Sequence, residues 1–192
     1  MAAALVGFLK TFGLAMRLGS AQRCVWFYGA DGHGAAAVDA PTAHVQPELL
    51  LAIALVESRF DVTALSRVEG NHRRAGRYPS TKPPANLNTR GSMYCGPLQT
   101  FAGSWAECMS MRDPHVAYAA GADELERWLR DRRVRGDVTR ALAGHGCGNH
   151  GVNTGKCNFY PQRVLWQERL FAMGLRRAHH AAQAQARTSP RS

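Results

Sequence analysis

The sequence predicts a mainly α fold. Three segments, 48–60, 113–135 and 160–174, place apolar residues three and four positions apart, which is the spacing of one helix face. Outside the loops there is no convincing alternation of apolar and polar residues of the kind that strands show. With 192 residues, 45% of them hydrophobic, the chain can form one domain with a sizeable core and tails.

The first predicted helix begins near Pro47-Glu48, because proline and an acid both suit a first helical turn. It ends near Phe60-Asp61. Before and after it the sequence predicts irregular structure: a glycine-containing lead-in over 22–46, and a polar loop rich in Pro, Gly and Asn between Ser66 and Gly91. That loop could form one wall of a cleft or be plain surface.

Glu57 stands at the end of eight consecutive apolar residues in this helix. Leu50, Ile53 and Ala54 lie on its face, so the carboxylate should sit on the buried stripe. Burial and the negative end of the helix dipole both disfavour a charged carboxylate, which is how a general acid is made. In the alternative, Glu57 turns outward at a frayed helix end and pairs with Arg59.

The remaining elements follow from caps and periodicity. Residues 91–105 predict a turn followed by a short helix, and Asp113 with Pro114 begins an amphipathic helix over 113–135. Residues 137–144 predict another short helix, which a glycine-rich loop follows. The last helix, over 160–174, should stop at Gly174. The basic tail over 175–192 should then be disordered.

The net charge of +10 comes mostly from arginine. It indicates either attraction to a polyanion, such as nucleic acid, a membrane surface or a cell-wall polymer, or simply an Arg-rich composition. No basic motif interleaves aromatic residues as nucleic-acid-binding segments do, so we expect no nucleic-acid partner. No stretch near the N-terminus is long and apolar enough for a membrane span, but residues 1–43 could include a degenerate export signal.

Five cysteines, at positions 24, 95, 108, 147 and 157, suit an oxidising compartment. Four of them permit two disulfides in three pairings, of which we prefer one that includes a Cys147–Cys157 bridge, with Cys24 left over. His145, Cys147, His150 and Cys157 also include ligand types that suit zinc, but their spacing matches no standard zinc motif. We therefore expect neither a metal nor a cofactor.

The order of these pieces resembles the soluble lytic transglycosylase family of lysozyme-like enzymes, which cut bacterial peptidoglycan. The segment ELLLAIALVESRFDVTALS, over 48–66, is similar to the catalytic helix and following turn of the family, and CGPLQT, over 95–100, is similar to its Gly-Leu-Met-Gln turn. The resemblance covers roughly 44–172. It implies a lysozyme-like domain over 44–174, with long loops that form a substrate cleft.

The resemblance implies roles for individual residues. Glu57 matches the catalytic acid, Ser66 a serine beside that acid, and Gly96 and Gln99 the substrate-side turn. His145 and Gly146 stand where the family has tyrosine and asparagine, which help to hold the acid and the sugar. His145 could replace that tyrosine, or lie on a solvent-facing loop, and Tyr160 could reach the cleft.

In this family one glutamic acid protonates the glycosidic oxygen and then acts as base while the 6-hydroxyl of the sugar closes on the anomeric carbon. The resemblance therefore implies 1,6-anhydromuramoyl ends and no second carboxylate. A hydrolysing muramidase of the same fold needs a second acid, for which Asp61 and Glu69 are the nearest candidates. The altered 145–146 pair leaves a third hypothesis, a catalytically weakened peptidoglycan-binding component of a phage tail or secretion apparatus.

Context follows from the resemblance and the cysteines together. We expect a monomer that binds peptidoglycan glycan strands in the cell envelope, either periplasmic or secreted. Short relatives also occur as phage proteins, so envelope or phage assembly partners stay open.

Overall fold

The computed structural model describes residues 32–40, 43–66, 76–78, 80–83, 93–157 and 159–188, with the side chains of 175 and 178–188 left out. The described chain is mainly helical and includes one small antiparallel sheet, so the predicted mainly α class is confirmed. None of its helices combines the length and hydrophobicity that a membrane span requires. The candidate export signal, Cys24 and Glu69 lie outside the described residues.

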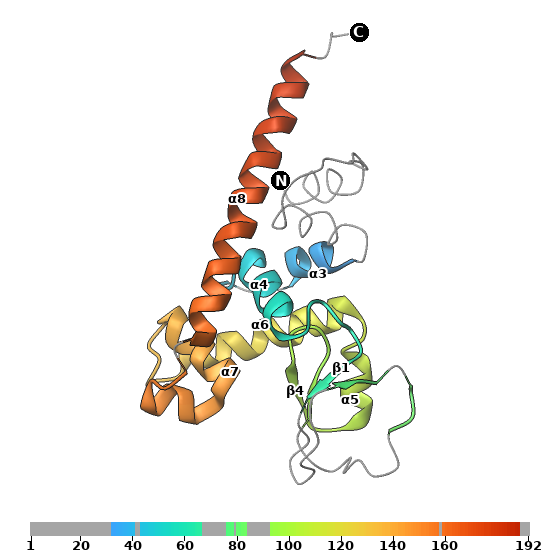
Figure 1. Cartoon of the computed structure of the whole chain (residues 1–192), viewed down its shortest axis with the longest axis vertical. Coiled ribbons are helices and arrows are strands. Elements are labelled where there is room, and N and C mark those ends of the chain that lie inside the picture. The colour runs from blue at the N-terminus through green and yellow to red at the C-terminus, as the bar shows by residue number, and fades with distance from the viewer. Residues whose placement is uncertain are drawn as a thin grey trace.

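Helix α4 (Pro47–Glu57) lies at the centre of the molecule (Figure 1). All six residues from Leu49 to Ala54 are buried, so the helix is covered on every side rather than along one stripe. It packs against α3 (His33–Asp39), α6 (Pro114–Arg130) and α8 (Phe159–Thr188). Proline at its N-terminus and Glu48 in its first turn begin it as the sequence predicts.

The prediction of irregular structure over 22–46 is wrong for residues 33–39, which form helix α3. This helix packs against α6 and α4, with Ala36 and Ala37 almost completely buried. The rings of His33 and Tyr118 of α6 lie 5.7 Å apart between centroids. Small residues let this short helix approach its neighbours closely, so it forms without a long apolar repeat in the sequence.

The sheet has the strand order β2-β1-β3-β4, built from β1 (Ala64–Ser66), β2 (Gly76–Arg77), β3 (Met93–Cys95) and β4 (Thr100–Ala102). The expectation that 91–105 holds a turn and then a helix missed β3 and β4. Strands of two or three residues are too short to show alternation. The turn is present, but the helix expected within 91–105 is displaced along the chain, since α5 (Trp105–Ser110) begins only at the last of these residues.

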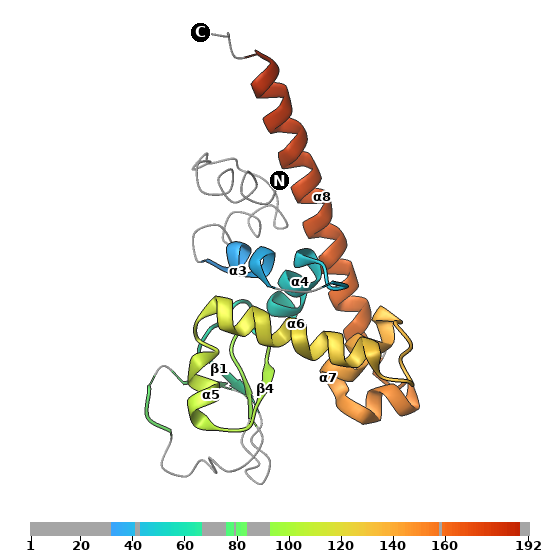
Figure 2. The same ribbon diagram turned by 180° about the vertical axis from the view of Figure 1, so that it is seen from behind.

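Helix α6 spans the body, with the sheet and α5 near one end and α7 (Val138–Thr154) at the other (Figures 1 and 2). Asp113 caps α6, since its carboxylate accepts a hydrogen bond from the backbone of His115, 2.8 Å away. This helix ends at Arg130 rather than 135.

Helix α7 replaces the short helix and glycine-rich loop that the sequence predicts. Its glycines permit close packing: a Cβ atom at Gly144 would lie 2.5 Å from the Trp128 ring, and one at Gly146 would lie 2.6 Å from the Tyr160 ring. The backbone leaves helical geometry only at Gly148, and Gly155 ends the helix in a left-handed conformation.

Helix α8 also differs from its prediction, because Gly174 does not end it and the helix continues to Thr188. In both views it extends well past α4 and away from the body (Figures 1 and 2). The region predicted as a disordered tail is therefore helical as far as residue 188.

Candidate functional site

Glu57 is the last residue of α4 and is half-buried. Leu50, Ile53 and Ala54 are buried beneath it, as its place on the helix face predicts. It forms no ion pair with Arg59, although both residues are described. The expected alternative of a pair with Arg59 at a frayed end is therefore not what the structure contains.

The backbone turns sharply directly after Glu57. Arg59 and Phe60 have φ values of 58° and 67°, in the left-handed region that non-glycine residues rarely adopt. The backbone N–H of Phe60 still donates to the carbonyl of Ala54, 3.2 Å away, so the turn is fixed to the helix. Consecutive strained residues of this kind cluster at functional sites.

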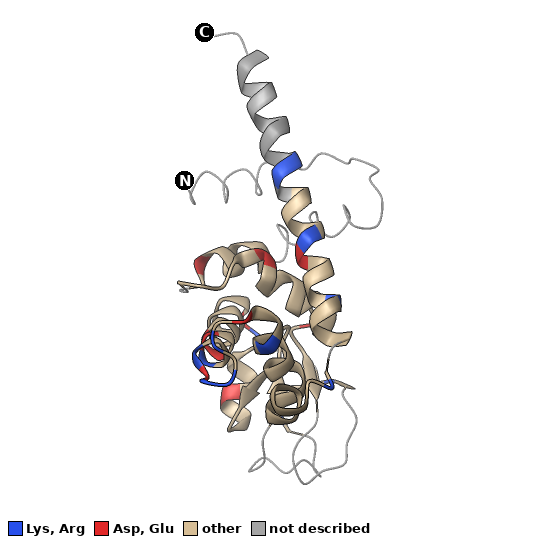
Figure 3. Ribbon diagram, turned by 90° about the vertical axis from the view of Figure 1, so that its left-hand side faces the viewer, with Lys and Arg blue, Asp and Glu red and all other residues tan. Residues whose placement is uncertain are grey.

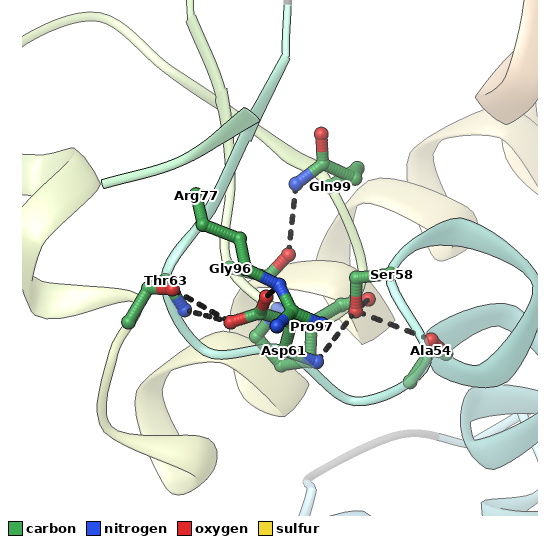
Figure 4. Close-up of polar contacts among 8 residues, drawn as sticks. All are labelled: Ala54, Ser58, Asp61, Thr63, Arg77, Gly96, Pro97 and Gln99. Carbon is green, nitrogen blue, oxygen red and sulfur yellow. Dashed lines mark hydrogen bonds and ion pairs between the residues drawn. The ribbon is translucent and has the colours of Figure 1, made fainter. Parts of the chain in front are cut away.

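Ser58 joins this turn to the segment Gly96–Gln99 (Figure 4). Its hydroxyl donates to the Pro97 carbonyl at 2.8 Å and accepts from the backbone N–H of Asp61 at 3.0 Å. The residue next to the candidate acid therefore holds the candidate substrate-side turn in place.

Glycine is required at position 96, which has a φ of +71°. A Cβ atom there would lie 2.7 Å from the backbone oxygen of Met111. Gln99 also has a positive φ of 52°, and its side-chain amide donates to the Gly96 carbonyl at 2.9 Å (Figure 4). The buried side-chain amide of Gln99 thus stabilises the turn through a hydrogen bond to its first residue.

His145 lies inside the molecule, with 2% of its side chain exposed. Its Nδ1 is 3.1 Å from a Glu124 carboxylate oxygen, and its Nε2 is 3.1 Å from the Leu98 carbonyl. The Leu98 carbonyl and an ionised Glu124 carboxylate can only accept hydrogen bonds, so this geometry suits an imidazolium whose two ring nitrogens both donate. The solvent-facing position considered for His145 is therefore wrong.

Glu124 completes a buried ion pair with His145. Burial raises the pKa of Glu124, but the hydrogen bond and charge of His145 outweigh it and leave that pKa lowered. Burial likewise lowers the pKa of His145, and the hydrogen bond and charge of Glu124, with the charge of Glu57, reverse this and raise it. The second oxygen of Glu124 accepts from the Phe101 backbone at 3.2 Å, so the pair secures both ends of the segment 98–101.

Tyr160 is buried at the start of α8, and its ring centroid lies 6.3 Å from that of His145. Burial first, then the charge and hydrogen-bonding contact of Glu57, raise the pKa of Tyr160, so the phenol keeps its proton. Within the described chain this hydroxyl makes no hydrogen bond of ordinary geometry. Tyr160 is thus a protonated phenol close enough to Glu57 for the carboxylate to raise its pKa.

Ser66 ends β1 and pairs with Tyr94 of β3, directly before the Gly96 turn. Glu57 is close enough to His145 and Tyr160 to raise the pKa of each, and the Gly96–Gln99 turn is bonded to Ser58 and to His145. Ser66 lies on β1, the strand next to the one that leads into the Gly96–Gln99 turn. Sequence reasoning missed Glu124, although it stands three residues after Gly121 and seven after Ala117, both buried, and so lies on a buried face of α6.

The candidate second acid Asp61 is committed elsewhere. Its carboxylate accepts from the backbone N–H and hydroxyl of Thr63 at 2.9 and 2.7 Å and pairs with Arg77 (Figure 4). It therefore fixes the turn after α4.

The cysteines form two bridges, Cys95–Cys108 and Cys147–Cys157, with Cα atoms 5.4 and 6.3 Å apart. The preferred Cys147–Cys157 pairing agrees with this, and neither cysteine offers a free thiolate to zinc. Among the described residues no three His, Cys, Asp or Glu side chains gather as metal ligands would.

No protein-family model, curated protein or solved structure matches this chain.

Proposed function

We propose that this chain is a peptidoglycan lytic transglycosylase with a lysozyme-like fold, in which Glu57 is the catalytic acid and base. The observation that carries the proposal is the position of Glu57: a half-buried carboxylate at the end of the central helix, next to a protonated phenol and joined through Ser58 to the Gly96–Gln99 turn. Asp61 and Glu124, two other acids of this region, are both held in ion pairs.

In the proposed reaction Glu57 donates its proton to the oxygen that links N-acetylmuramic acid to N-acetylglucosamine. The resulting carboxylate then accepts the proton of the 6-hydroxyl as that oxygen bonds to the anomeric carbon. The glycosidic bond breaks, the 1,6-anhydro ring forms, and no water is consumed. Tyr160, which the sequence suggested could reach the cleft, can donate a hydrogen bond to the carboxylate between these steps.

His145 has a different role from the family tyrosine that it replaces. Both of its nitrogens are occupied, so it positions Leu98 and the turn and acts on Glu57 only through its charge. The space beside Gly146 is filled by the Tyr160 ring. Glycine at position 146 therefore leaves the space that the Tyr160 ring occupies beside His145.

Product analysis tests the reaction. Purified sacculi digested with the protein should release soluble fragments with anhydromuramoyl ends, detected by mass spectrometry. Fragments one water heavier, with reducing ends, would instead support the muramidase hypothesis and direct attention to Glu69.

The binding hypothesis also has an observation in its favour, since His145 offers no free donor to Glu57. Binding to sacculi without release of any fragment by folded protein would support it over catalysis. The two disulfides favour an oxidising location, and we propose the cell envelope, with a phage particle as the alternative.

A further inference from the structure

A concave region lies between the last turn of α4 and the second turn of α8. It is a pocket of about 290 Å³, open to solvent. These two helices pack together along this part of the molecule (Figure 1). Its lining residues come from both helices: Leu55, Val56, Arg59, Arg163, Trp166 and Gln167.

The lining combines two cations with an apolar surface. Leu55 and Val56 form a partly buried apolar portion, and Trp166 is 59% exposed, which is a large exposed area for this side chain. Within the described chain neither Arg59 nor Arg163 forms an ion pair with a carboxylate. A guanidinium fits a carboxylate through two parallel hydrogen bonds, so this lining suits a carboxylate attached to an apolar group.

The position of Arg59 is fixed by the strained backbone after Glu57. Its left-handed φ of 58° costs folding free energy in any residue other than glycine. In spite of that cost, the side chain at this position lines the pocket. Basic residues also recur along the described part of α8 (Figure 3), and Arg163 is the one that lines the pocket.

The pocket adjoins the candidate catalytic group. Val56 immediately precedes Glu57, and Arg163 lies one helical turn after Tyr160, close enough for its charge to act on the tyrosine hydroxyl. A ligand in the pocket would therefore lie near a glycan strand held at Glu57. We propose that the pocket binds a carboxylate of the peptide stem that muramic acid residues of the glycan bear, an inference that rests on the proposed function.

Binding to three glycan preparations tests this inference. Soluble strands that retain their stems, strands whose stem carboxylates are amidated, and strands stripped of stems are titrated against the full chain with Glu57→Gln, so that none is cut. We expect the intact strands to bind about tenfold more tightly than the other two. Adding Arg59→Gln or Arg163→Gln should remove this difference.

Arg169→Gln is the matched control, because Arg169 is exposed on the same helix and does not line the pocket. It should keep the tenfold preference, and thermal unfolding should verify that every variant is folded. Equal affinity for the three preparations would overturn the inference, as would an equal loss in Arg163→Gln and Arg169→Gln. Full displacement of the stems by a short DNA oligonucleotide would also overturn it.

The wild-type chain separates this inference from the proposed function. Cleavage of stripped strands, combined with no gain from stem carboxylates, would reject the pocket proposal and keep the transglycosylase. Stem-dependent binding without cleavage of any strand would keep the pocket and reject the activity.

Discussion

The ion pair between His145 and Glu124 makes folding stability depend on pH. The His145 pKa is raised above 6.5, so its contribution is complete below about pH 6.5 and is lost as pH rises through the raised pKa. The Glu124 pKa is lowered below 4.5, so its contribution is complete above that pH and is lost as pH falls through the lowered pKa. The pair therefore stabilises the fold most between these two values.

We predict that His145→Gln loses about 3 kcal/mol of unfolding free energy at pH 6, because the substitution leaves Glu124 buried without its charge partner. At high pH, where the wild-type ring is neutral, the loss should be smaller. Urea unfolding across pH 5 to 10 measures both effects. A difference between wild type and variant that stays constant with pH would contradict an imidazolium at this position.

Gly96→Ala tests the close approach in the turn. The new methyl group would meet the Met111 backbone and adopt a positive φ, so the unfolding free energy should fall by about 3 kcal/mol. Gly136→Ala is the control, because Gly136 has a φ of +78° with no atom within 4 Å of the added carbon. It should lose only about 1 kcal/mol. Equal losses would mean that contact with Met111 adds nothing.

At the scale of elements, the Cys147–Cys157 bridge closes the segment that includes the Gly148 break in α7 and leads to α8. Replacing both cysteines by serine should cost about 3 kcal/mol, as for other loops of this length. Urea unfolding without reductant measures the cost, and the same measurement with reductant should bring the wild type close to the variant. A variant as stable as the oxidised wild type would contradict a stabilising role for the bridge.

Periodicity predicts two of the long helices well, but it ends α8 at Gly174 instead of Thr188 and predicts the short or glycine-containing elements poorly. The helices around 47–57 and 114–130 follow from caps and apolar spacing. Helix α7 does not, since its glycines look like a loop in the sequence and serve close packing against Trp128 and Tyr160 in the structure. Helix propensity considers only the local sequence, so it cannot predict that a glycine is needed for packing against a distant aromatic ring.

At the scale of the whole molecule, the candidate site is partly readable from sequence. The buried face of the first helix predicts the position of Glu57, and the turn motif predicts Gly96 and Gln99. The pairing of His145 with Glu124 and Leu98 needs α6, α7 and the turn to be placed in space, because these residues are 21 and 47 positions apart. Only the fold reveals that Glu124 is a member of the group.

The same limit applies to the two arginines of the pocket. Arg59 and Arg163 are separated by most of the domain and become neighbours only because α4 packs against α8. The net charge of +10 does not show where on the molecule the basic residues gather. The packing gives two of its cations a defined place.

The proposed reaction depends on Glu57 as its acid and base. The most direct test digests sacculi with the wild type, Glu57→Gln and Glu48→Gln, the last an acid at the opposite end of the same helix. Mass spectrometry should find anhydromuropeptides from the wild type and Glu48→Gln, and at least a thousandfold fewer from folded Glu57→Gln, since the general acid is lost. Wild-type amounts of these products from Glu57→Gln would contradict the account.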